Sequence, residues 1–232
     1  MMLEPPPAPG VEETMTGKAY AVLEEMIVTL QLPPGEVLSE SGLTRLLNIG
    51  RTPIREALQR LAIEGLVVIL PRRGILVSDI NVSSQLELLR LRREVERLMA
   101  RLAAARATPA QREAFVTLNH DMLHSAELED DIAFMRQDTE FNTLLAQACG
   151  NEYARRAMSL MAGLSRRFWY QHYRQALDLP RCARLHAAVA AAIGAGDADA
   201  AGAANDRLID YTEDFTRATL ESGVNRSAPA GR

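Results

Sequence analysis

The sequence predicts a mainly α protein in two parts. A small N-terminal domain of three helices and a β-hairpin is followed by an all-α antiparallel bundle of six or seven helices. Apolar residues recur at helical spacing over most of the chain, which favours helices. Two short β-branched runs flank the turn at 71–74, as is typical of a hairpin. No strand-like alternation follows residue 83, so the second part is expected to be helical throughout.

The first two helices are separated by a proline-rich turn. Helical periodicity begins at Thr16 and must stop at LPPGE (32–36), because two prolines followed by glycine cannot continue a helix. Ser39 is expected to cap the second helix. The apolar stripe of that helix is predicted to consist of Leu43, Leu46 and Leu47.

The third helix lies in RTPIREALQRL (51–61), after a tight turn at 48–50. Thr52 is expected to cap it, with Pro53 at its first position, where the missing N–H costs nothing. The runs at 66–70 and 75–80 then form the hairpin, whose turn carries two arginines. Three helices followed by a basic hairpin are the layout of a winged helix-turn-helix.

Positive charge is concentrated in this region. The 232-residue chain has a net charge of -4, yet the segment 45–73 holds six arginines and only two glutamates. The second helix of a helix-turn-helix pair enters the major groove of DNA, and arginine can hold guanine O6 and N7 with two hydrogen bonds. We therefore expect DNA binding; the alternative is a surface helix with solvated arginines. The candidate DNA contacts are Arg45, Arg51, Thr52, Arg55, Gln59, Arg72 and Arg73.

The rest of the composition indicates a soluble protein. Apolar residues make up 47% of the chain and charged residues 24%, and no apolar run reaches the length of a membrane span. The N-terminus lacks the features of a secretory signal, so a cytoplasmic location is expected. No nucleophile–base pair or phosphate-binding glycine loop is apparent, and an enzyme is not expected.

The segment LSESGLTRLLNIGRTPIREALQRLAIEGLVVILPRRGILV (38–77) resembles the DNA-binding domain of GntR-family bacterial transcription regulators. This resemblance implies that Arg51 and Arg55 contact the operator, that Thr52 contacts phosphate, and that Gly74 in the wing closely approaches the DNA backbone. The chain departs from the family at Gly50, where serine or threonine is usual.

The second half resembles the FCD effector domain of the FadR branch in three segments, 89–108, 136–151 and 184–201. The chain is accordingly expected to divide into four parts. These are a disordered tail (1–13), the winged helix-turn-helix (14–80), an effector-binding and dimerisation domain (81–222) and a second disordered tail (223–232).

In many FCD domains an Asp-x3-His pair and two later histidines bind a divalent metal, zinc or a similar ion. Here Asp138 and His186 match the family pattern, but Asn142 replaces one histidine and Leu208 the other. The resemblance therefore leaves two interpretations open: a metal site of Asp138, Asn142 and His186, or a hydrogen-bonded polar cluster in the bundle interior.

Arg92 lies beside a predicted core stripe of Leu88, Leu91, Val95 and Leu98. In FCD regulators an arginine of this helix often binds the effector's carboxylate. The alternative is an ion pair with Glu96, because a half-buried arginine is costly without a partner. The candidate effector contacts are Arg92, Asp138, Asn142 and His186.

Together these patterns predict a ligand-responsive transcription regulator, a repressor that binds a pseudo-palindromic operator as a homodimer. The expected effector is a small organic acid. The alternative is a winged-helix DNA-binding protein whose bundle only dimerises and binds no effector.

Overall fold

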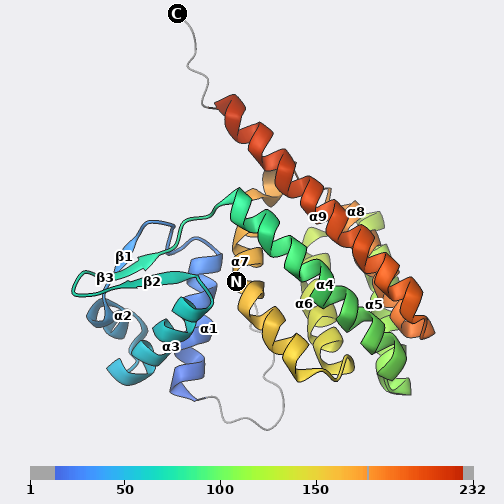
Figure 1. The fold of residues 1–232 in the computed structure, drawn as a ribbon, viewed down its shortest axis with the longest axis horizontal. Helices are drawn as coiled ribbons and strands as arrows, with labels where there is room; N and C mark the ends of the chain where they lie inside the picture. The colour runs from blue at the N-terminus through green and yellow to red at the C-terminus, as the bar shows by residue number, and fades with distance from the viewer. Residues whose placement is uncertain (1–13, 177, 227–232) are drawn as a thin grey trace, which may run out of the picture. The chain divides into compact units, whose positions relative to one another are not determined.

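The structure is a computed structural model that describes residues 14–176 and 178–226. The described chain up to Ile80 forms one compact unit, and the chain from Asn81 forms a second (Figure 1). The tail expected at 1–13 lies outside the described residues. The expected end of the structured chain at 222 differs from the structure, in which the last helix continues to Arg226; residues 227–232 are again outside the description.

Three helices form the core of the first unit: α1 (Met15–Val28), α2 (Glu40–Leu47) and α3 (Arg51–Ile63). The Ser39 side chain accepts a hydrogen bond from the Gly42 N–H and caps α2, as expected. The helix α1 packs on α3 through residues that are fully or almost fully buried, namely Ala19, Leu23, Ile27, Ile54, Ala57, Leu58 and Leu61.

Two expectations for this region are wrong. The cap of α3 is Gly50, which offers no side-chain hydrogen bond, so Thr52 is the second residue of the helix rather than its cap. Leu46 is 60% exposed and does not belong to the apolar stripe of α2. Ile49, from the turn between α2 and α3, is buried instead.

The wing is a three-stranded antiparallel sheet of order β1-β3-β2. The hairpin strands are β2 (Val67–Leu70) and β3 (Gly74–Val77), and the two-residue strand β1 (Val37–Leu38) pairs with β3. The strand β1 was not expected from the sequence. It follows the proline turn, and it connects the chain before α2 to the wing. The strand β3 is therefore paired on both sides, with β1 on one side and β2 on the other.

A buried carboxylate ties α3 to α1. Glu64, directly after α3, is only 6% exposed. It accepts hydrogen bonds from the Tyr20 hydroxyl at 2.7 Å and from Arg60 Nε at 3.1 Å. The Arg60 guanidinium also stacks 3.5 Å from the centre of the Tyr20 ring. This arrangement satisfies the buried charge and removes Arg60 from the arginines available to DNA.

The second unit contains six helices in the described part of the chain, within the expected six or seven. They are α4 (Val82–Arg106), α5 (Pro109–Leu128), α6 (Asp131–Ala148), α7 (Glu152–Ala176), α8 (Leu179–Ala195) and α9 (Ala198–Arg226). The helix α4 lies along α9, and α5 lies along α8 (Figure 1). Their shared core includes Phe115, Met122, Ala187 and Ile193. Among the described helices none is long and apolar enough to cross a membrane.

The predicted core stripe of α4 is wrong at Leu91 and Leu98, whereas Val95 packs against the core as expected. Leu91 is 55% exposed and Leu98 is 45% exposed, whereas the buried face consists largely of Leu89, Met99, Ala100, Ala103 and Ala104. Small alanines let α4 approach its neighbours closely, so this face is buried in preference to the leucines. The exposed leucines remain on a stripe of five apolar residues, Leu88, Leu91, Val95, Leu98 and Leu102, which we call the α4 stripe.

Candidate functional site

The polar residues of α3 share one face. Arg51, Thr52, Arg55 and Gln59 are all exposed, while Ile54, Ala57 and Leu58 on the other side are buried. Because α1 covers the apolar side, the helix can present only this polar face to a ligand. It places two guanidinium groups near the N-terminal end of α3, where the helix dipole also favours phosphate.

Arg55 has a partner that sequence reasoning missed. Its Nη2 lies 2.8 Å and its Nε 3.0 Å from the two carboxylate oxygens of Glu40, the first residue of α2. The hydrogen bond from Arg55, together with the charges of Arg55 and Arg51, lowers the pKa of Glu40 despite slight opposing burial. No helical periodicity indicates this pair, because its two residues lie on different helices and are fifteen positions apart in the chain.

The wing carries Arg72 and Arg73 at the exposed end of its hairpin. Gly74 has a φ of +104°, and a Cβ placed on it would lie 2.7 Å from the Leu38 carbonyl oxygen. The glycine is therefore required by the close approach of β1.

The remaining charge of this unit is available to a ligand. Arg45 is exposed in the last turn of α2. Among the described residues, no carboxylate forms an ion pair with Arg45, Arg51, Arg72 or Arg73. The unit can thus offer a polyanion four guanidinium groups that are not held in an ion pair.

In the second unit, the structure brings the candidate effector residues together. His186 Nε2, from α8, lies 3.0 Å from Asp138 Oδ1 on α6. The other ring nitrogen, Nδ1, donates to the Cys182 carbonyl at 3.0 Å. Asn142 is exposed, and its Nδ2 donates to Asp138 Oδ1 at 3.1 Å. The edges of Phe134 and Phe141 close around the imidazole.

Arg92 joins this cluster from α4. Its Nε lies 2.5 Å from Glu96 Oε1, and both side chains are largely buried. The Arg92 charge also contributes to lowering the pKa of the Asp138 carboxyl. Arg92 with Glu96 and His186 with Asp138 thus form two pairs, each of a basic side chain with a carboxylate.

The Asp138–His186 contact shifts the pKa of both groups. Burial raises the pKa of the Asp138 carboxyl, but the charge and hydrogen bond of His186 outweigh it, so the pKa lies below its ordinary value. Burial lowers the pKa of the His186 imidazole, yet the Cys182 thiol and the Asp138 carboxylate raise it well above its ordinary value. Each partner thus favours the charged form of the other.

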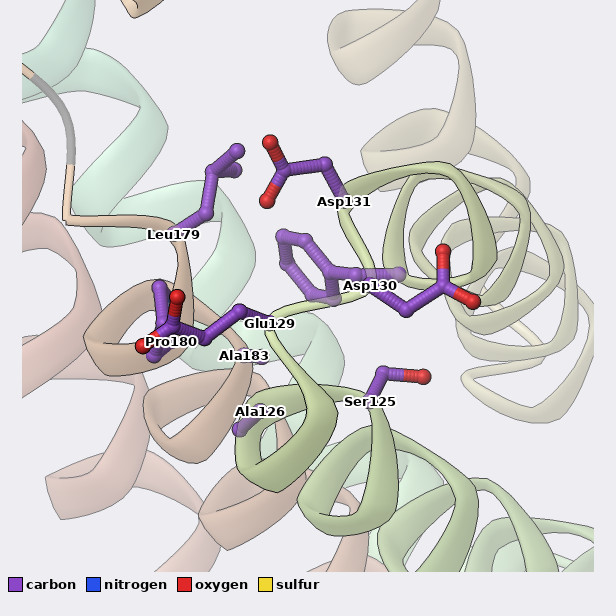
Figure 2. A pocket seen from close by; sticks show the side chains of 9 residues that line it. Ser125, Ala126, Glu129, Asp130, Asp131, Leu179, Pro180 and Ala183 are labelled. Carbon is purple, nitrogen blue, oxygen red and sulfur yellow. The ribbon is translucent and has the colours of Figure 1, made fainter.

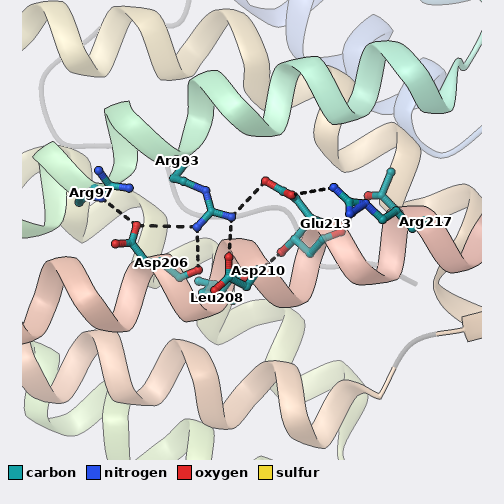
Figure 3. Close-up of polar contacts among 9 residues, drawn as sticks. Arg93, Arg97, Asp206, Leu208, Asp210, Glu213 and Arg217 are labelled. Atoms are coloured by element: carbon teal, nitrogen blue, oxygen red, sulfur yellow. Dashed lines mark hydrogen bonds and ion pairs between the residues drawn. The ribbon is translucent and has the colours of Figure 1, made fainter.

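These residues do not fit the family's metal site. Leu208, at the fourth position, is buried among apolar side chains, and Asn142 presents its donor nitrogen to Asp138. The nearby Asp206 is held by Arg97 Nε at 2.8 Å and by Arg93, whose guanidinium also reaches Asp210 and Glu213 (Figure 3). Within residues 14–176 and 178–226, no group of three or more His, Cys, Asp or Glu is arranged to hold a metal ion.

A small hollow opens beside the cluster, between the end of α5 and the starts of α6 and α8 (Figure 2). Its empty space is about 150 Å³, open solvent included. It is lined by Ser125, Ala126, Glu129, Asp130, Asp131, Phe134, Leu179, Pro180 and Ala183. Arg92, Asp138 and His186 do not line this hollow, and its three carboxylates do not suit an anion.

Comparison with known proteins identifies the family. The model of the gntR family of bacterial regulatory proteins matches residues 15–77, and the FCD domain model matches residues 87–211. The chain belongs to the GntR family. It combines a GntR DNA-binding domain with a C-terminal FCD domain, and is a transcription regulator rather than an enzyme.

Relatives of this GntR regulator carry matching descriptions. An uncharacterized HTH-type transcriptional regulator from an unstable DNA locus of Streptomyces ambofaciens is 33% identical over 135 residues, which cover 57% of this chain and 55% of that protein. The HTH-type transcriptional repressor RspR of Escherichia coli K12 is 28% identical over 181 residues, or 78% of this chain and 79% of that protein.

Solved structures confirm the fold, a winged helix-turn-helix followed by a helical bundle. E. coli McbR/YncC aligns with a TM-score of 0.72 at 19% identity, over 89% of this chain and 99% of that one. A transcriptional regulator GntR from Rhodococcus sp. RHA1 aligns with a TM-score of 0.62 at 22% identity, over 88% of this chain and 97% of that one.

The Asp138–His186 contact predicts a pH-dependent stability. Because the pKa of His186 is raised in the folded state, its protonation stabilises the fold. This contribution to the free energy of unfolding is fully present below the ordinary histidine pKa of 6.5, and it is lost as the pH rises through the pKa of the folded state. The pKa of Asp138 is lowered in the folded state, so its ionised form contributes to stability above the ordinary aspartate pKa of 3.8. Urea unfolding of wild type and Asp138→Asn should therefore show a stability gap that narrows above pH 6.5, by at most about 1.4 kcal/mol per pH unit.

The variant serves as the control, because it keeps every other titrating group. A gap that stays constant from about pH 6 to about pH 9 would contradict a charged Asp138–His186 pair.

Proposed function

We propose that this GntR regulator is a repressor that binds a pseudo-palindromic operator as a homodimer, with α3 of each subunit in the major groove. The observation that carries the proposal is the single exposed face of α3, which holds Arg51, Thr52, Arg55 and Gln59 opposite the buried face. Arginine donates two hydrogen bonds to guanine, and glutamine can do the same to adenine.

Arg45, Arg72, Arg73 and Gly74 fit a second role, in which they contact the backbone or minor groove and carry no sequence information. Thr52, which is free from capping, can donate its hydroxyl to a phosphate. Because the bacterial chromosome lies in the cytoplasm, this function would place the protein there. The printed name of RspR, a transcriptional repressor, supports the assignment as a repressor.

Homodimerisation is supported by the α4 stripe. Its members follow a spacing of three and four residues, which is the pattern of a helix that packs against a second helix. Leu91 is 55% exposed and Leu98 is 45% exposed, and such a pair of leucines fits a second copy of the same helix across a two-fold axis.

The effector is proposed to be a small carboxylate that binds beside Arg92 without a metal ion. A carboxylate can replace Glu96 on the Arg92 guanidinium, since both offer the same two oxygens. Binding would shift the population between two separations of the DNA-binding units, of which one fits both half-sites. The second candidate, a bundle that only dimerises, is favoured by the pairing of each cation with a carboxylate in the cluster.

Arg55→Ala tests base reading. We expect it to weaken binding to an operator selected from random DNA by about 1–3 kcal/mol and to change binding to scrambled DNA little. Arg73→Ala is the matched control: the loss of a phosphate contact should weaken binding to both duplexes alike. Fluorescence anisotropy titrations measure both. An unchanged operator affinity for Arg55→Ala would contradict the proposed role of α3.

Leu91→Glu together with Leu98→Glu tests the α4 stripe. Light scattering on a sizing column should give twice the chain mass of 25.5 kDa for wild type and the single-chain mass for the double variant. Leu160→Glu, which changes a leucine of α7 that is also 45% exposed, should remain dimeric. A double variant that stays dimeric would place the interface elsewhere.

A thermal-shift series of small carboxylates, with and without a chelator of divalent metals, tests the effector. One acid should raise the melting temperature of wild type equally under both conditions and leave Arg92→Gln unchanged. A shift that requires added metal would contradict the metal-free site, and a series without any shift would favour the bundle that only dimerises.

A further inference from the structure

The contact between Glu40 and Arg55 uses one edge of the guanidinium. Nε and Nη2 face the two carboxylate oxygens at 3.0 and 2.8 Å, so the two planar groups meet as parallel forks. The Arg55 side chain is nevertheless 62% exposed. The carboxylate therefore holds the arginine without covering it.

The other edge of the guanidinium remains available. Arginine has five N–H groups, of which Glu40 accepts two. The end of the group, formed by Nη1 and the second N–H of Nη2, still has two parallel donors. Guanine O6 and N7 require two such donors in one plane. The pairing with Glu40 is thus compatible with reading a guanine at the same time.

The position of Glu40 is fixed by the start of α2. Glu40 is the first residue of α2, directly after the Ser39 cap, so the helix start determines where its side chain begins. The Glu40 side chain is 33% exposed, and the charges of Arg55 and Arg51 stabilise the ionised form of its carboxylate. A long, exposed arginine is thereby restrained to one orientation before it meets DNA, which reduces the ordering cost of binding.

We propose that Glu40 is a positioning residue for sequence reading, which holds the Arg55 guanidinium in the plane that a guanine requires. This inference rests on the proposed function, because it requires that α3 reads DNA. A carboxylate this close to the DNA-facing arginines also repels phosphate. Glu40 therefore favours the correct sequence and weakens binding to other DNA, which is how a repulsive group contributes to specificity.

The inference predicts opposite effects of Glu40→Ala on two kinds of DNA. The test uses full-length protein, an operator duplex that wild type selects from random DNA, and a scrambled duplex of equal length. We expect the variant to bind the operator duplex more weakly and the scrambled duplex more tightly. The ratio of the Kd for scrambled DNA to the Kd for the operator should therefore fall about 5- to 50-fold. In an Arg55→Ala background the same change should alter this ratio less than about twofold.

Glu56→Ala is the matched control. It removes a carboxylate from α3 itself, but that carboxylate binds the Thr16 hydroxyl at 2.6 Å and not Arg55. The specificity ratio should stay at the wild-type value. Glu40→Gln keeps the shape of the side chain and one acceptor oxygen, so an intermediate ratio is expected. It carries the test if thermal melting shows that Glu40→Ala weakens α2.

Three results would overturn the inference. An unchanged ratio in both Glu40 variants would make Glu40 a repelling charge only. An equal fall of the ratio with and without Arg55 would show that Glu40 acts independently of the arginine. A wild-type protein that selects no sequence would overturn the proposed function together with this inference, and it is distinguished from the other two results before any variant is made.

Discussion

The burial of one face of α3 against α1 is the constraint on which the DNA-binding unit depends. Ile54, Ala57 and Leu58 must lie against α1, and this fixes the rotation of α3 about its axis. The buried carboxylate of Glu64, held by Tyr20 and Arg60, fixes the end of the same helix. A charge buried with these partners is costly to separate from them, so α3 cannot turn without breaking the contact. The orientation of Arg51 and Arg55 toward solvent follows from packing on the opposite side.

In the bundle, α4 has two different faces with different partners. Alanines and Met99 pack into the core, while Arg93 and Arg97 form ion pairs with acidic residues of α9 (Figure 3). These contacts leave Leu91 and Leu98 of the α4 stripe exposed among the described residues, while Val95 and Leu102 pack against the core. On another part of the same helix, Arg92 contributes to a cluster whose positive and negative groups balance. One helix therefore supports the proposed dimer and the proposed effector contact, which gives a physical route by which a ligand could alter the spacing of two subunits.

Local signals in the sequence predicted much of the fold, and contacts between distant residues account for what was missed. The Ser39 cap, the proline turn and the hairpin each depend on a few neighbouring residues, and the structure confirms them. The strand β1 has only two residues and exists because β3 passes beside it, which no local pattern reveals. On α4, the buried face that includes Leu89 and Met99 is shifted by one residue from the α4 stripe. Only the close packing that alanines allow determines which of the two is buried. The family resemblance predicted that Asp138 and His186 lie in one site. Glu40 was missed because its contact with Arg55 depends on how α2 and α3 pack together.

The most direct test of the account is methylation interference on the selected operator. Methylation of guanine N7 removes the acceptor that Arg51 or Arg55 would use in the major groove. The account predicts that methylation of guanines in each of two half-sites, about 10 base pairs or a multiple of that spacing apart, abolishes binding. Binding that tolerates N7 methylation throughout the operator would contradict the central claim that the exposed face of α3 reads bases.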